Sequence, residues 1–291
     1  MLTLSLIAAP AAANLESALL DSLRRGWGGT DPRWLNPGIA AEFRMPARPD
    51  DLDQVAEDLR TIGIDVAVQP TAGRRKHILL ADMDSTMIQQ ECIDELADLA
   101  GVGERVAAIT ARAMNGELNF HEALIERVGL LAGLNEAVIA DVLRDRITLT
   151  PGGRELIATM RAQGAYTALV SGGFTDFTEP VAKMLGFDEN RANALLSDGG
   201  VLTGHVGLPI LGREAKIEAL EEITAKRGLT PADAMAVGDG ANDLGMLKLA
   251  GAGVALHAKP VVAAEVDLRI NHGDLTALLY LQGYGSDEFV T

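Results

Sequence analysis

The hydrophobic pattern of the chain changes character near residue 73. Before that point, short apolar runs with strand-like alternation are separated by amphipathic segments of helical periodicity. The elements predicted there are strands over 2–8, 38–45 and 64–69, and helices over 14–26 and 50–63. The pattern predicts a small α+β domain over residues 1–72. The apolar start lacks a basic n-region and is very short, so it is interpreted as a strand and turn rather than a secretion signal.

From residue 77 onward, the pattern becomes strand, polar loop and helix, repeated. Four compact apolar runs predict strands over 77–81, 165–170, 234–238 and 252–256. Such runs are typical of buried parallel strands with crossover helices, so residues 73–291 are predicted to form an α/β domain. The helical stretch at about 87–149 is too long for a simple crossover and is interpreted as an inserted cap. Two strand-like runs around Asp-Gly-Gly predict a hairpin over 193–207.

Composition narrows the class of protein. The chain has 291 residues, 48% of them hydrophobic, which is enough for a sizeable core. Its formal net charge of −16 argues against binding to nucleic acid and to anionic membranes. No apolar run approaches the length of a membrane span. The single cysteine, Cys92, excludes an intramolecular disulfide and fits a reducing cytoplasm, where we expect the protein to reside.

Polar residues follow three of the predicted strands where each strand ends. Asp82 and Asp84 follow the first, Ser171-Gly172-Gly173 the second, and Asp239 and Asp243 the third. Ligands of open parallel sheets bind beyond these carboxyl ends, so the three loops are expected at one rim. Four clustered carboxylates would repel one another without a cation, and hard oxygen ligands favour Mg²⁺.

Each of these signals has a simpler interpretation on its own. Asp84 and the two residues after it would also suit a helix cap, and Ser-Gly-Gly is a common turn. Lys216, which would balance phosphate charge at such a rim, would alone be interpreted as a solvated surface lysine. The ordered occurrence of all the signals after successive strands favours a site.

These residues carry a resemblance. Asp82–Thr86, Ser171–Gly173, Lys216 and Gly238–Asp243 resemble the four motifs of the haloacid dehalogenase (HAD)-type phosphatases. The longer strings DMDSTMIQQECIDELA, NFHEALIERVGLL and VGDGANDLGML resemble the phosphoserine phosphatases of that family. The resemblance covers roughly residues 76–282 and implies an α/β fold, a HAD-type Rossmann-like parallel sheet with an inserted helical cap. Residues 1–72 are outside it and only loosely resemble ACT-like regulatory domains.

The resemblance also implies roles at the rim. Asp82 would be the nucleophile that forms an aspartyl phosphate, and Asp84 the general acid and then the general base. Side chains of Asp82 and Asp239, with the backbone carbonyl of Asp84, would bind Mg²⁺. Other motif residues would hold the phosphoryl group or would orient the residues that hold it. They are Ser171, Gly172, Gly173, Lys216, Asn242 and Asp243.

Substrate selection would come from the cap. The resemblance implies that Glu91 meets the substrate ammonium and that Arg127 clamps its carboxylate, with Met114 and Phe120 as an apolar wall. Taken singly, Glu91 would be a surface acid on a helix, Arg127 an exposed partner of a residue one turn away, and Met114 and Phe120 core residues.

The implied activity is Mg²⁺-dependent hydrolysis of O-phosphoserine, a small-molecule substrate, as the last step of serine biosynthesis. Phosphothreonine or phosphohomoserine as substrates, and a non-catalytic metabolite-binding regulator, remain alternatives. The sequence leaves the oligomeric state open, a homodimer included.

Overall fold

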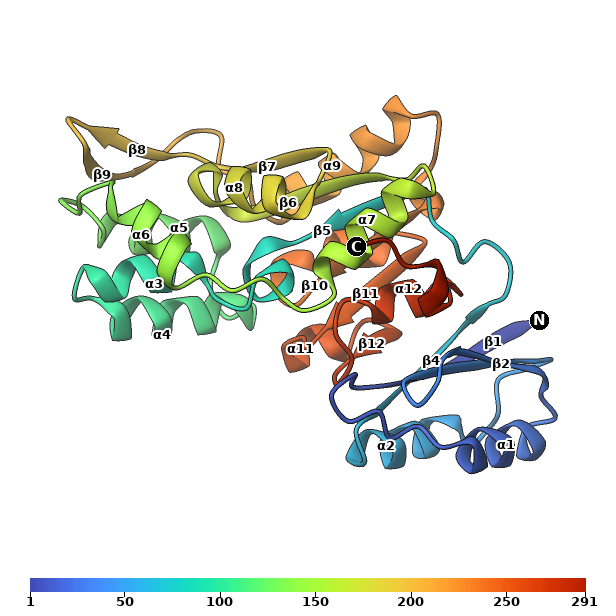
Figure 1. Cartoon of the computed structure of the whole chain (residues 1–291). Helices are drawn as coiled ribbons and strands as arrows, with labels where there is room; N and C mark the ends of the chain where they lie inside the picture. Colours follow the sequence, from blue (N-terminus) through green and yellow to red (C-terminus); the bar gives the residue numbers. More distant parts are fainter.

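The computed structural model describes residues 1–291 and contains a six-stranded parallel sheet, a four-stranded antiparallel sheet and a two-stranded hairpin (Figure 1). The parallel sheet has the order β12-β11-β10-β5-β6-β7. Its strands are β5 (Ile78–Ala81), β6 (Tyr166–Phe174), β7 (Glu189–Asn193), β10 (Ala234–Gly238), β11 (Ala252–Leu256) and β12 (Leu268–Ile270). The α/β architecture predicted from the sequence is confirmed.

The two faces of the parallel sheet are covered by different helices. Alternate side chains of a strand point to opposite faces, and in β5 Ile78 and Leu80 join one core cluster while Leu79 and Ala81 join another. The first cluster includes residues of α9 (Arg213–Lys226) and α10 (Leu244–Leu249). The second includes residues of α7 (Gly153–Ala162), α8 (Thr175–Leu185) and α12 (Ala277–Leu281). The double burial explains why β5 is apolar throughout.

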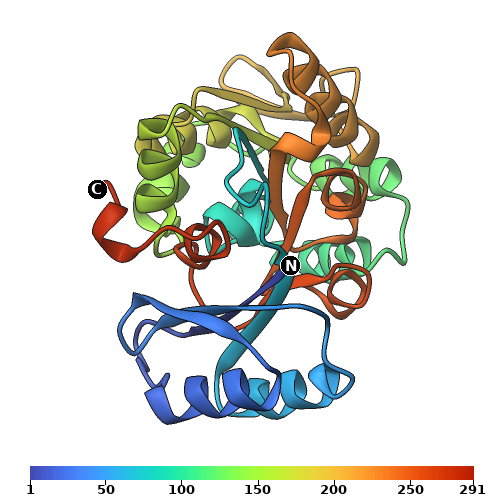
Figure 2. The same cartoon turned by 90° about the vertical axis from the view of Figure 1, so that its right-hand side faces the viewer.

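The antiparallel sheet lies beside β12 and α12, near the C-terminal end of the chain (Figure 2). Its order is β2-β3-β1-β4, with strands β1 (Leu2–Ala8), β2 (Thr30–Asn36), β3 (Ala40–Met45) and β4 (Ile64–Pro70). Helices α1 (Ser17–Gly26) and α2 (Leu52–Thr61) cover one face through an 11-residue core. Residues of the other face, including Ile7, Leu35, Ala40 and Ala67, belong to the same 43-residue cluster as α12. The small sheet and the parallel sheet therefore share buried apolar surface.

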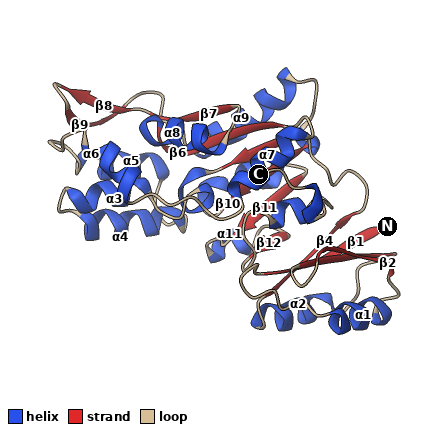
Figure 3. Ribbon diagram, viewed as in Figure 1, coloured by secondary structure: helices blue, strands red, loops and turns tan.

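Four helices lie between β5 and the helix that precedes β6, at the far side of the molecule from the small sheet (Figure 3). They are α3 (Cys92–Leu99), α4 (Gly103–Met114), α5 (Phe120–Gly129) and α6 (Val138–Asp145). The hairpin of β8 (Leu195–Asp198) and β9 (Val201–Val206) lies beside them, and a bridge joins Asn135 to Val201.

Some elements differ from the sequence prediction. Strands β2, β7 and β12 were not predicted: β2 contains Pro32, β7 has the polar sequence ENRAN, and β12 has only three residues. Glu91 was expected inside a helix, but its backbone is extended and α3 begins at Cys92. None of the helices is long and apolar enough to cross a bilayer.

Candidate active site

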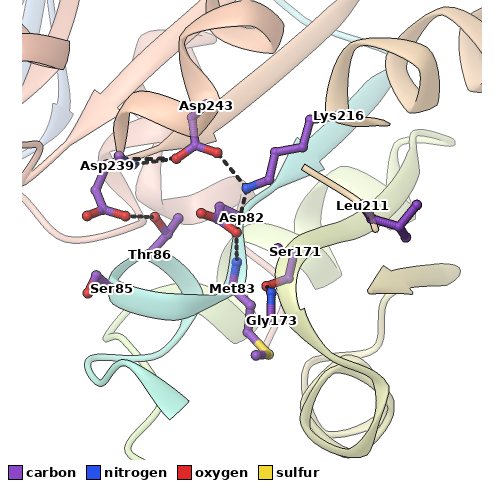
Figure 4. A network of polar contacts seen from close by, with 12 residues as sticks. Asp82, Met83, Ser85, Thr86, Ser171, Gly173, Leu211, Lys216, Asp239 and Asp243 are labelled. Carbon is purple, nitrogen blue, oxygen red and sulfur yellow. Dashed lines mark hydrogen bonds and ion pairs between the residues drawn. The ribbon is translucent and has the colours of Figure 1, made fainter. Parts of the chain in front are cut away.

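The site begins where β5 ends. Asp82 has an extended backbone, and the chain then turns tightly through Met83–Met87, with Ser85 in the left-handed region at φ 53°. At the start of this turn the Met83 N–H donates to Asp82 Oδ1 at 2.8 Å. The neighbouring strand ends, β6 and β10, bring Ser171 and Asp239 to the same rim (Figure 4).

Lys216 is a buried lysine that joins two acids of the rim. It reaches in from α9 with 1% of its side chain exposed, and its Nζ lies 2.7 Å from Asp82 Oδ1 and 2.6 Å from Asp243 Oδ1. Burial opposes its charge, but the carboxylates of Asp243 and Asp82 outweigh burial and raise the pKa of Lys216. Burial and the Asp243 charge raise the pKa of Asp82 to about 7 against the influence of Lys216. The interpretation of Lys216 as a surface residue is wrong.

Asp239 and Asp243 complete an acidic group with Asp82. One carboxylate oxygen from each of the three lies within 4.8 Å of the others. Asp243 is already engaged, because its Oδ2 also accepts from the N–H groups of Asp239 and Gly240 at 3.2 and 3.0 Å. Asp239 accepts from Thr86 Oγ1 at 3.2 Å through Oδ1, but its buried Oδ2 has no hydrogen-bond partner.

This arrangement fits a bound cation. A buried carboxylate oxygen without a partner is costly to leave unpaired, and three acids in contact repel one another. Burial, with the charges of Glu91, Asp243 and Asp82, raises the pKa of Asp239 well above its usual range. Oxygen-only donors of this kind suit a hard divalent ion.

Asp84 differs from the other rim acids. It is 9% exposed, its Oδ1 has no hydrogen-bond partner, and its carboxylate is not among the three that group together. Burial, and after it the charges of Glu91 and Asp82, raise the pKa of Asp84 well above its usual range. This shift favours the protonated form of the carboxyl group, which is the form that an acid catalyst needs.

The Ser171-Gly172-Gly173 segment forms the opposite wall. The Gly173 N–H donates to Ser171 Oγ at 2.9 Å, which leaves the hydroxyl hydrogen of Ser171 free for a ligand. Gly172 has room for no side chain, since a Cβ there would lie 2.6 Å from Phe120 Cζ. Its carbonyl is fixed from behind by Asn193 Nδ2 at 2.8 Å. The glycines let the cap approach the rim closely.

One pocket joins the rim to the cap. Its lining brings together most of the residues predicted from the sequence: Asp82, Asp84, Glu91, Met114, Phe120, Arg127, Ser171, Gly172, Gly173 and Asn242. Lys216, Asp239 and Asp243 lie outside the lining, behind Asp82 and around it.

The cap end of the pocket is charged and largely buried. Arg127 is 6% exposed, so the interpretation as an exposed surface arginine is wrong. Glu91 is partly buried and accepts from Ser85 Oγ at 2.6 Å. Burial raises the pKa of Glu91, and burial lowers that of Arg127 against the charges of Glu91 and Asp94. Met114 and Phe120 are half-buried beside them.

Sequence reasoning missed several residues of this region. Leu124 lines the pocket, and its place one helical turn before Arg127 on α5 would have identified it. Ile93 and Phe174 also line the pocket, next to predicted residues. Lys259 has its Nζ 3.8 Å from Asp239 Oδ2 and its N–H bonded to the Asp239 carbonyl at 3.0 Å. No sequence signal marks Lys259, because β11 alone brings it to the rim.

Comparison with known proteins defines the class. Residues 79–248 match the model of the haloacid dehalogenase-like hydrolase family, and the chain belongs to that family. The resemblance noted in the sequence is thereby confirmed. A phosphoserine phosphatase of Archaeoglobus fulgidus is 41% identical over 246 residues, which make up 82% of this chain and 71% of that protein.

Similar solved structures agree with this family membership. The crystal structure of a HAD family hydrolase from Salmonella enterica serovar Typhi covers 96% of this chain and 97% of its own length, with a TM-score of 0.84 at 30% identity. A phospho-aspartyl intermediate analogue of phosphoserine phosphatase covers 71% of this chain and 98% of its own, with a TM-score of 0.68 at 41% identity. The first match extends over the small sheet, and the second over less of the chain.

Proposed function

We propose that this protein hydrolyses O-phosphoserine to serine and phosphate, the last step of serine biosynthesis. The observation that carries the proposal is one pocket whose lining combines the acids Asp82 and Asp84 with Glu91 and Arg127. Phosphoserine has the complementary groups, a phosphate beside an ammonium and a carboxylate. The name of the Archaeoglobus relative supports the same substrate.

Asp82 is the nucleophile in this proposal. Both hydrogen bonds to its carboxylate end on Oδ1, from the Met83 N–H and Lys216, so Oδ2 is left to attack phosphorus. A bond forms between Oδ2 and phosphorus while the bond from phosphorus to the serine oxygen breaks. Asp84 gives its proton to the departing oxygen, and serine leaves as a neutral alcohol at that oxygen.

The second half of the reaction uses the same residues. Asp84, now a carboxylate, takes a proton from a water molecule that attacks phosphorus and releases Asp82. Through both halves the Ser171 hydroxyl and the Gly172 N–H donate to the phosphoryl oxygens, while Lys216 offsets negative charge behind Asp82. Asn242 lines the same pocket and lies beside Asp243, which holds Lys216 in place.

The cation of this proposal is Mg²⁺. The carboxylates of Asp82 and Asp239, with the backbone carbonyl of Asp84, would hold it, and the unpartnered Asp239 Oδ2 supports this assignment. When bound, Mg²⁺ supplies positive charge that draws electron density from the phosphoryl group and offsets the repulsion among the acids. Asp243 orients Lys216 and the rim N–H groups rather than serving as a ligand.

The cap residues select the substrate. Glu91 binds the ammonium and Arg127 the carboxylate, with Met114 and Phe120 covering the carbon chain. One extra methyl or methylene group is discriminated only modestly by such a pocket, so phosphothreonine and phosphohomoserine are the nearest competitors. Residues 1–72 are proposed to form a separate domain, since all the proposed chemistry follows residue 76.

A phosphate-release assay tests the proposal. The protein, with Mg²⁺, is offered phosphoserine, phosphothreonine, phosphohomoserine and phosphoethanolamine, and kcat/KM is compared. We expect phosphoserine to be the best substrate and EDTA to abolish release, with recovery on added Mg²⁺. Binding of phosphoserine in calorimetry without phosphate release would instead identify a metabolite-binding regulator. A higher kcat/KM for another ester would reassign the substrate.

A further inference from the structure

Arg127 is held by a hydrogen-bond chain that the proposed reaction does not use. Its Nη1 donates to Thr110 Oγ1 at 3.1 Å, and Thr110 Oγ1 donates to Asp94 Oδ1 at 2.6 Å. Thr110 is 3% exposed and Arg127 is 6% exposed. The three residues come from α4, α5 and α3, so the chain ties three cap helices together.

The direction of this chain is fixed by chemistry. A hydroxyl has one hydrogen, and the carboxylate of Asp94 at 2.6 Å is its nearest acceptor, with the Val106 carbonyl farther away at 3.1 Å. A lone pair of Thr110 Oγ1 is thereby turned toward the guanidinium. The Arg127 Nε donates to the Ala123 carbonyl at 3.1 Å. Two of the five guanidinium N–H groups are thus taken, and the Nη2 edge has no bond within the protein.

The position of Thr110 has an electrostatic consequence. Glu91 and Asp94 both attract Arg127, although neither carboxylate lies within 4.0 Å of its guanidinium nitrogens. The hydroxyl of Thr110 stands between Asp94 and the guanidinium, so it transmits part of the attraction while keeping the charges apart.

We propose that Thr110, oriented by Asp94, is a positioning residue that aims the open edge of Arg127 into the pocket and thereby selects substrates that carry a carboxylate. This inference rests on the proposed function, because it deepens the role given there to Arg127. Thr110 acts through Arg127 and lines none of the pocket itself.

The test compares two esters in Thr110→Val, which keeps the shape of the side chain and removes the hydroxyl. With phosphoserine we expect KM to rise roughly 5- to 20-fold at nearly unchanged kcat, as one charge-assisted hydrogen bond and its geometry are lost. With phosphoethanolamine, which lacks the carboxylate, KM should stay within about twofold. Thr110→Ser should restore the phosphoserine KM.

A matched control and a double variant separate positioning from folding. Thr224 in α9 is also a buried helical threonine, but its hydroxyl is bonded only to backbone carbonyls, those of Leu220 and Glu221. Thr224→Val should leave both KM values unchanged. In an Arg127→Ala background, Thr110→Val should add nothing to the loss, since its only route to the substrate is gone.

Equal effects of Thr110→Val on the two esters, or additive effects with Arg127→Ala, would overturn the inference. A failure of serine release from phosphoserine by the unmodified enzyme would instead refute the proposed function itself. If Thr110→Val does not fold, Thr110→Ser and Asp94→Asn carry the test: the serine variant should match the unmodified protein, and the asparagine variant should raise only the phosphoserine KM. An unchanged phosphoserine KM in Asp94→Asn would count against the inference.

Discussion

Two regions of the molecule contain buried carboxylates. In one region the carboxylate oxygens accept hydrogen bonds, and in the other some of them accept none. Where the small sheet meets the loop after β12, Asp65 is 3% exposed and accepts from the N–H groups of Asn271, His272 and Gly273 at 2.8–2.9 Å. At the rim of the parallel sheet, Asp84 Oδ1 and Asp239 Oδ2 are buried and accept no hydrogen bond, although Lys259 Nζ lies 3.8 Å from Asp239 Oδ2.

The two regions also differ in how lysine and arginine side chains pair with their acids. Elsewhere on the small sheet, Arg74 pairs with Glu42 through two hydrogen bonds of 2.7 and 3.2 Å, so the two buried acids of that sheet, Glu42 and Asp65, both have partners within the protein. At the rim, Lys216 satisfies Asp82 and Asp243 but reaches neither Asp84 nor Asp239. Buried acids whose oxygens all accept hydrogen bonds stabilise the fold, whereas buried oxygens without a hydrogen bond indicate a candidate ligand-binding site.

The largest effect should follow from Asp82→Asn. The amide keeps the shape and can still accept from Lys216, but it cannot form a stable acyl phosphate. We expect a loss in kcat of roughly four orders of magnitude or more, with the fold retained, as when other single catalytic groups are removed. Acid quenching with labelled substrate should trap phosphoenzyme in the unmodified protein and none in the variant.

Asp198 provides the matched control for that variant. It is an exposed acid in the β8–β9 hairpin, and Asp198→Asn should leave turnover unchanged. Deamidation of Asp82→Asn back to Asp is excluded by mass spectrometry. If turnover is then still near normal, Asp82 is not the nucleophile, and the rim acids are not distinguished from the structural acids of the small sheet.

The next effect concerns the cap. Arg127→Ala should lower kcat/KM for phosphoserine by about 30- to 1000-fold, which corresponds to about 2–4 kcal/mol for a partly desolvated charge-assisted contact. Phosphoethanolamine should lose little because it never makes the contact. Arg127→Lys should recover only part, since an ammonium lacks the planar fork. Parallel losses for both esters would show that Arg127 supports the cap instead of binding the substrate.

Asp65→Asn tests the structural side of the comparison. The amide cannot accept all the N–H groups that converge on Asp65, so urea unfolding should show a loss of about 1–3 kcal/mol in the free energy of unfolding. The kcat/KM for phosphoserine should change little, because no bond from Asp65 reaches the rim. Asp50→Asn, at an exposed acid, should alter neither quantity.

The change in kcat/KM for Asp65→Asn can be converted to a free energy and compared with the change in the free energy of unfolding. If the kinetic change is the larger of the two, the small sheet acts on catalysis. Its apolar face shares a core with α12, so deleting residues 1–72 is a poorer experiment: it would uncover buried surface around Ile7 and Ala67.

The smallest effect should come from Lys259→Met. Lys259 is 37% exposed and stands 3.8 Å from the unpartnered Asp239 Oδ2, where its charge competes with a bound cation. Calorimetry should show Mg²⁺ binding about fivefold tighter in the variant, from about 1 kcal/mol of Coulomb repulsion in a solvated setting. Lys248→Met, at an exposed pair with Glu265, should not change the affinity. Weaker binding in Lys259→Met would mean that Lys259 supports Asp239.

The sequence by itself determined the strands that carry chemistry and the order of the residues that follow them. β5, β6, β10 and β11 are buried on both faces, so each appears as an apolar run, and parallel pairing must bring their carboxyl ends to one edge. Strands at exposed edges, such as β2 and β7, gave no such signal because half of their residues face solvent or carry polar groups.

The tertiary structure alone decided which groups surround those residues. Thr110 and Asp94 meet Arg127 across three helices, Lys259 reaches Asp239 from the loop after β11, and Asp65 binds a loop about 206 positions away in the chain. Such contacts depend on how separate elements pack. Packing between two distant segments leaves no periodic pattern in the sequence of either segment. The acids proposed to react could therefore be predicted from the chain, whereas the residues that surround them were identified only in the folded protein.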